Sequence, residues 1–183
     1  MAILLGFAPF ILFVIVEQAV GVSAGLISAA IVSLGLVARE ALRGRRLKVL
    51  ELGTTILFGG LAIYAWVAGG AWSVFGVRLA VDAGLFLIVL ISMAIGLPFT
   101  LPYARERVPP EVWERPEFIR TNYIVTAAWA VAFAVIVAAD ALLLYAPQVP
   151  AAAGIAVTVL ALVGAIRFTT WYPARVRAKV IGT

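Results

Sequence analysis

The chain has 183 residues, of which 64% are hydrophobic and only 13% charged, and its mean hydropathy is +1.12. Such a composition excludes an ordinary soluble domain and predicts an all-α integral membrane protein. The net charge is +5, but the basic residues lie beside apolar stretches, which favours a bilayer with an anionic inner leaflet over nucleic acid as the partner. The sequence has no His and no Cys, which excludes disulfides, thiolate nucleophiles and ordinary zinc or haem sites.

Six segments are long and apolar enough to be considered as membrane spans, for which about 20 residues are needed. In chain order they are residues 3–20, 23–38, 52–67, 77–97, 123–145 and 151–170. The second and third are short and would cross the membrane with little tilt. The first lacks the basic start and the cleavage pattern of a removable signal, so we expect it to be retained. Residues 1–183 are thus predicted to form a single polytopic transmembrane domain.

Basic residues mark one side of the predicted membrane domain. Lys and Arg number 14, and all but Arg78 fall within residues 39–48, 105–120 and 167–179. The connections on the other side are short and contain no basic residue. Because cytoplasmic loops collect Lys and Arg, both termini are predicted to be cytoplasmic.

Short motifs recur along the chain. Ala24-Gly25-Leu26, Ala83-Gly84-Leu85 and Ala153-Gly154-Ile155 each open a span that is predicted to run inward. The fourth and sixth spans also end alike, in residues 99–105 and 168–175. These matches favour three helical hairpins in parallel orientation, and chance similarity between Ala-, Gly- and Leu-rich segments is the alternative.

The loop between the fourth and fifth spans is rich in proline. Pro98 and Pro102 are predicted to end the fourth helix, because proline cannot donate to a helical ladder. Pro109 and Pro110 then open a turn, in which Trp113 is expected to dip into the inner membrane interface. The predicted result is a short turn that lies on the membrane surface.

Residues of this loop and of the fifth span carry a resemblance to a known family. They are Ile95-Gly96-Leu97-Pro98, Val108-Pro109-Pro110-Glu111-Val112-Trp113, Asn122 and the Ala-rich run 127–133 with Trp129. Together they resemble the bacterial intracellular septation protein A family, as does the opening run 7–13, whereas residues 99–100 and 114–117 depart from its pattern. The resemblance implies a multi-pass protein of the bacterial inner membrane, connected with septum and envelope formation, and it supplies no catalytic site.

Ionisable residues are rare within the predicted spans. Glu17, Arg78, Asp82 and Asp140 lie at a similar depth near the outer ends of their spans, and Arg78 and Asp82 are one helical turn apart. Charges inside a membrane are costly and by default indicate function, here an outward-facing site for a cation, a proton or a cationic solute, but the position of these residues near the outer surface weakens that inference. The alternative is a structural cluster of ion pairs at the headgroup level.

No motif typical of an enzyme is present: there is no His/Glu metal pattern, no nucleophile elbow and no phosphate loop. We therefore expect a non-enzymatic protein without metal or cofactor. The resemblance to the septation family implies that it acts through helix and cytoplasmic-loop contacts with membrane proteins of envelope assembly. The alternative function is a small oligomeric transporter or channel that uses the four outer charged residues. In that case a second copy of the chain would be a partner.

Overall fold

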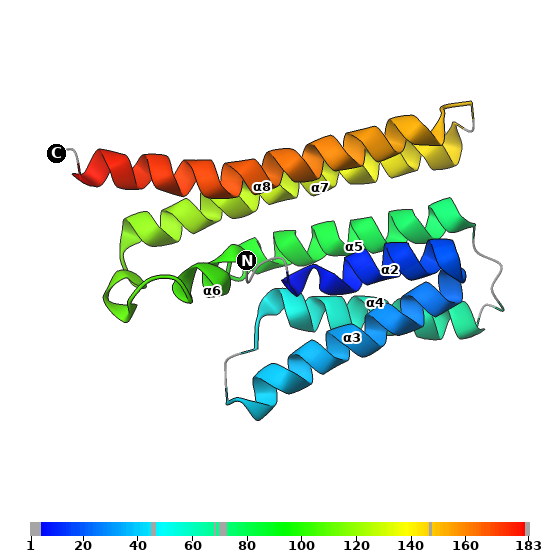
Figure 1. The fold of residues 1–183 in the computed structure, drawn as a ribbon, viewed down its shortest axis with the longest axis horizontal. Helices are drawn as coiled ribbons and strands as arrows, with labels where there is room; N and C mark the ends of the chain where they lie inside the picture. Colours follow the sequence, from blue (N-terminus) through cyan, green and yellow to red (C-terminus); the bar gives the residue numbers. More distant parts are fainter. Residues whose placement is uncertain (1–4, 45–46, 68, 70–72, 147, 182–183) are drawn as a thin grey trace. The chain divides into compact units, whose positions relative to one another are not determined.

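A computed structural model describes the chain except for residues 1–4, 45–46, 68, 70–72, 147 and 182–183 (Figure 1). All regular structure within the described part is helical, which confirms the predicted all-α class. The elements in chain order are α2 (Ala8–Ala19), α3 (Val22–Leu42), α4 (Val49–Val67), α5 (Val74–Ala94), α6 (Thr100–Arg105), the 3₁₀ turn η1 (Pro110–Val112), α7 (Pro116–Tyr145) and α8 (Ala151–Ile181).

Five of the described helices are long and apolar enough to cross a membrane: α3, α4, α5, α7 and α8. This indicates a multi-pass membrane protein. Helices α3 and α4 contain the second and third predicted spans and have 21 and 19 residues. They are longer than the apolar stretches because residues with high helix propensity, such as Ala, Arg, Glu and Leu, continue α3 beyond its stretch. That only a short part of each helix crosses the membrane stays a prediction.

The first apolar segment differs most from its prediction. Residues 3 and 4 of the predicted span lie outside the described part, the chain turns at Phe7, and α2 has only 12 residues. At 1.5 Å per residue this helix is about 18 Å long, less than the roughly 30 Å of a hydrocarbon core. Pro9 stands in the first turn of α2, where its missing N–H is not needed.

Helix α5 ends at a glycine and not at the predicted prolines. Gly96 has a positive φ of 78°, and the N–H of Leu97 donates to the carbonyl oxygen of Ser92 at 2.9 Å. This is the Schellman pattern, in which glycine closes a helix. Pro98 follows the end of the helix, and Pro102 lies inside the first turn of α6, so the prediction that they stop the fourth helix was wrong.

The chain divides into two compact units, residues 1–88 and residues 89–183. In the first unit α3 packs against both α2 and α4. A buried apolar core joins these helices to α5, and Phe58 of α4 lies at its centre, with its ring centroid 5.0 Å from that of Phe10 and 5.7 Å from that of Phe13. The core residues are Phe13, Leu26, Ala29, Phe58, Ala65, Val77 and Val81.

The second unit is built on the long pair α7 and α8. These helices run antiparallel and side by side (Figure 1), and α6 packs against α7. Trp129, Phe133 and Ile136 provide the largest fully buried side chains of α7. A single domain over residues 1–183 stays a prediction.

The glycine of the repeated motif has the same role in each predicted hairpin. A Cβ at Gly25 would lie 3.0 Å from Cβ of Glu17 in α2, a Cβ at Gly84 would overlap Leu57 of α4, and one at Gly154 would overlap Leu143 of α7. In all three cases the glycine therefore faces the helix that precedes its own. Small residues at such positions allow close approach of helices.

We predict that Gly25→Leu destabilises the first unit by about 1–3 kcal/mol, the usual range for overpacking. The new side chain would have to displace the Phe13 ring and the backbone of α2, both about 3.1 Å from a Cβ at this position. Unfolding in detergent micelles, followed by circular dichroism, measures the change. The matched control is Gly35→Leu in the same helix, where a Cβ meets nothing within 4 Å. Equal losses in both variants would contradict the close contact of α2 and α3.

Candidate functional site

An ion pair links two helices of the first unit. Nη2 of Arg78 in α5 donates a hydrogen bond of 2.8 Å to Oε2 of Glu17 in α2. The side chain of Glu17 is only 4% exposed, whereas that of Arg78 is 26% exposed. Glu17 is therefore the buried member of the pair, and Arg78 reaches it from a more open position.

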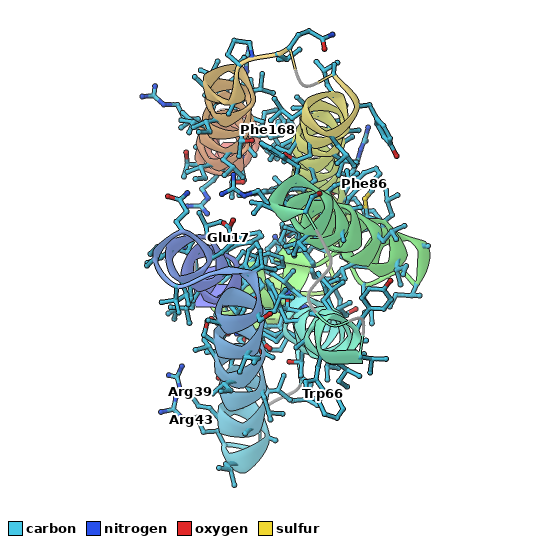
Figure 2. The ribbon with its side chains drawn as sticks, turned by 90° about the vertical axis from the view of Figure 1, so that its right-hand side faces the viewer. Glu17, Arg39, Arg43, Trp66, Phe86 and Phe168 are labelled. Atoms are coloured by element: carbon cyan, nitrogen blue, oxygen red, sulfur yellow. The ribbon has the colours of Figure 1, made fainter. Side chains whose placement is uncertain are left out.

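Packing around the pair explains how residues 61 positions apart meet. Val77, next to Arg78, and Phe13, one turn before Glu17, both belong to the apolar core of the first unit. On the other side, Gly25 of α3 lies against the Cβ and the backbone of Glu17 (Figure 2 labels Glu17). Because Gly25 has no side chain, Glu17 of α2 can lie directly against α3 and is buried there.

The other two predicted acids of the outer cluster lie apart in the chain. Asp82 is partly buried and lies one turn after Arg78 on α5. Asp140 is buried near the end of α7, in the second unit. The structure thus brings Glu17 and Arg78 together and keeps Asp82 on the helix of Arg78.

A second group of residues lies around α6, and we call it the α6 platform: residues 96–126, from the end of α5 to the start of α7. Its centre is the hydroxyl of Thr100, which lies 2.8 Å from Oγ1 of Thr126 and 3.1 Å from the main-chain oxygen of Asn122. Nδ2 of Asn122 donates to the carbonyl of Phe118 at 2.9 Å. The side chains of Thr100, Asn122 and Thr126 are buried, as is Pro98, so α6 is fixed to α7 by polar contacts within an apolar surrounding.

Trp113 stabilises the loop that follows α6 in the α6 platform. Its Nε1 lies 3.2 Å from the carbonyl oxygens of both Arg105 and Val108, to which it can donate. The guanidinium of Arg105 lies over the indole ring, 5.5 Å from its centroid. The indole N–H of Trp113 is therefore used by the loop itself, and the position of Trp113 at the membrane interface stays a prediction. Pro109 and Pro110 are exposed, and η1 begins at Pro110.

Trp129 connects the platform helix α7 to α8. Its Nε1 donates to Oγ1 of Thr169 at 2.8 Å, and its ring lies against Phe99 and Phe133. The sequence interpretation singled out Asn122 and Trp129. It missed Thr100, Thr126 and Thr169, whose hydroxyl groups form the hydrogen bonds of this region. A signal was present, because Asn122 and Thr126 are one turn apart on a single helix face.

A buried charged group at the α3–α4 connection was also missed. Glu40, Lys48 and Glu51 are all buried, and Nζ of Lys48 lies 3.6 Å from Oε1 of Glu51. In the sequence Glu40 and Lys48 belong to the basic cluster of residues 39–48, and Glu51 follows directly after it. Only the packing of α3 on α4 reveals that their side chains are removed from water.

Within the described ranges no group of three or more acidic side chains is placed to hold a metal ion. Comparisons of the chain with protein-family models, with curated proteins and with solved structures found no match. The helices themselves therefore define the class to which the chain is assigned, that of helical multi-pass membrane proteins.

Loss of Arg78 should destabilise the first unit more than loss of Glu17. Arg78→Gln leaves a carboxylate that is 4% exposed without its ionic partner, and breaking a buried pair costs about 3–5 kcal/mol. Glu17→Gln leaves a guanidinium that is already partly exposed, so its cost should fall below that range. The measurement is unfolding of each variant in detergent micelles at neutral pH.

The double variant Glu17→Gln/Arg78→Gln is the control for this prediction. It removes both charges, so it should be less destabilised than Arg78→Gln alone. If the two single variants lose the same stability and the double variant loses their sum, the pair does not couple α2 to α5.

Proposed function

We propose that the chain is a non-enzymatic protein of the bacterial inner membrane, of the septation type, which acts through contacts with membrane proteins of envelope assembly. The α6 platform is the observation that supports this proposal. Its polar side chains bind one another, as described above, while charged side chains of both signs are exposed. The exposed charged residues of this segment are Glu106, Arg107, Glu111, Glu114, Arg115, Glu117 and Arg120.

A fixed loop with exposed charges of both signs suits a protein partner. Complementary charges on two surfaces give specificity and orientation to their association. A surface with charges of both signs is a poor binding site for a phosphate group, because its carboxylates repel an anion. The resemblance to the septation family is also densest in the platform and in the part of α7 that follows it, and Pro98, Asn122 and Trp129, which contribute to the resemblance, are buried.

We propose further that the chain crosses the membrane six times with both termini in the cytoplasm. The loops that carry the basic clusters alternate along the chain with loops that carry none. Helix α2 is too short to span by itself, so this arrangement requires described residues before α2, from Leu5 to Phe7, to take part in the first crossing. Phe7 itself is buried, which supports a position inside the protein for the turn.

Cysteine labelling tests this topology, since the chain has no Cys of its own. Arg43→Cys, Arg107→Cys and Arg175→Cys should be protected from a membrane-impermeant thiol reagent in intact cells and react after permeabilisation. Ser73→Cys, in a connection without basic residues, should react in intact cells. All four positions are exposed, so burial does not explain protection. The reverse labelling pattern would overturn the proposed orientation.

A transporter or channel is the second candidate, and the buried carboxylate of Glu17 favours it. An acid removed from water inside a membrane protein often lies on the path of an ion. Glu17, however, is bound to Arg78 at 2.8 Å, so its charge is already balanced. A balanced pair stabilises helix contacts without binding a further cation, and this supports the first candidate over the second.

A complementation experiment separates the two candidate functions. Deletion of the gene in its own bacterium should give elongated cells with delayed or misplaced septa. The wild type and the double variant Glu17→Gln/Arg78→Gln should restore division, whereas Arg115→Glu/Arg120→Glu on the exposed platform surface should not.

The amount of each variant in the membrane is the control, measured by immunoblot. If the platform variant restores division and the variant without the ion pair does not, the proposal fails and transport is favoured. Solute flux through proteoliposomes that is lost in Glu17→Gln would then establish the second candidate.

A further inference from the structure

The end of α8 carries an exposed face with two arginines and a tryptophan. Helix α8 has 31 residues and is about 46 Å long, so it extends beyond a hydrocarbon core of roughly 30 Å. Arg167, Trp171 and Arg175 are spaced i, i+4 and i+8, which places them on one side of the helix. All three are exposed. We call them the Arg167–Arg175 face.

One positive charge of this face lies against its tryptophan. The guanidinium carbon of Arg175 lies over the ring of Trp171, 5.1 Å from the centroid. Side chains of a helix lean toward its N-terminus, so Arg175 reaches back to Trp171, and Arg167 leans the same way and lies about 12 Å further along α8 toward the middle of the membrane. Among the described residues neither guanidinium forms an ion pair, so both charges are open to an external anion.

Aromatic side chains fix the depth of this face in a membrane. Trp171 is 52% exposed, and next to it the rings of Phe168 and Tyr172 are stacked with centroids 5.3 Å apart (Figure 2 labels Phe168). Trp and Tyr collect at the boundary between the hydrocarbon core and the headgroups. The level of Trp171 is therefore the level of lipid phosphates.

An apolar path continues from this face toward the middle of the membrane. Leu160 and Val163 are exposed, and a Cβ at Gly164 would meet nothing within 4 Å. Residues 160, 164 and 167 follow one another on the same side of α8. A lipid whose phosphate lies at Trp171 would thus have its acyl chain along Gly164 and Leu160.

We propose that the Arg167–Arg175 face binds an anionic phospholipid, with the headgroup phosphate at the guanidinium of Arg175 and an acyl chain that runs past Arg167 along Gly164. Two uncompensated positive charges beside such a lipid complement an anionic headgroup and give no such preference for a zwitterionic one. The site is independent of the proposed function, because it follows from α8 alone.

Fluorescence quenching by brominated lipids tests this site. The protein is reconstituted into phosphatidylcholine vesicles that contain a small, equal fraction of brominated phosphatidylglycerol or brominated phosphatidylcholine. The emission that is lost on Trp171→Phe reports on Trp171 in a chain with five Trp. Brominated phosphatidylglycerol should quench this emission more strongly, and Arg167→Gln/Arg175→Gln should lower the preference about fivefold for each arginine removed.

The matched control is Arg39→Gln/Arg43→Gln, which removes two exposed basic side chains from one side of α3 (Figure 2). Its preference for phosphatidylglycerol at Trp171 should equal that of the wild type. Equal quenching by the two brominated lipids, or an equal loss of the preference for phosphatidylglycerol in both double variants, would overturn the site and leave only general attraction to an anionic surface.

A competition experiment on the wild type does not depend on how the variants fold. Unlabelled phosphatidylglycerol should relieve the quenching and phosphatidylcholine should not, and the opposite result would also overturn the proposal.

Discussion

Lipid offers no hydrogen bonds, and this constraint governs how the polar side chains of the chain are arranged. Buried hydroxyls bind the carbonyls of their own helices, as Thr54 does with Leu50 at 2.6 Å and Ser92 with Val89 at 2.6 Å. Other polar groups project from their helix and bind a group of another helix. Glu17 with Arg78 and Trp129 with Thr169 are the examples in the first and the second unit. Polar contacts thereby select which helices are neighbours, a choice that apolar surfaces leave open in lipid.

Close packing depends on a second feature, the glycine near the start of a helix. Gly25, Gly84 and Gly154 each face the preceding helix of the chain, which supports the prediction of three hairpins built on one plan. In the first hairpin this packing and the polar contact are coupled, because Gly25 makes the room for Glu17 and Glu17 then binds Arg78 of α5. Glu17 and Arg78, two residues of the predicted outer charge cluster, are thus part of the framework of the first unit, and this supports a structural use of the pair.

The α6 platform shows how an irregular segment is stabilised next to long apolar helices. Gly96 closes α5, Thr100 and Thr126 join α6 to α7, and the N–H of Trp113 is used by carbonyls of the loop. Outside these internal contacts, charged side chains of both signs remain exposed on the segment. The similar sequence in residues 168–175 continues α8 without a break, because no glycine and proline precede it at the positions of Gly96 and Pro98. Two related sequences therefore serve different roles, one as a platform and one as the proposed lipid face.

The sequence by itself determined the all-α class, the approximate position of the long apolar helices and the basic loops between them. These properties are local, because the apolar length of a segment and its charges can be counted along the chain. Only the tertiary structure decided that Glu17 binds Arg78, that Glu40 is buried and that Trp129 donates to Thr169. Helices that are apolar on every side have no polar face to indicate their rotation or their neighbours. The partner of a polar side chain in such a helix is therefore set by packing between distant segments, which residue spacing does not reveal.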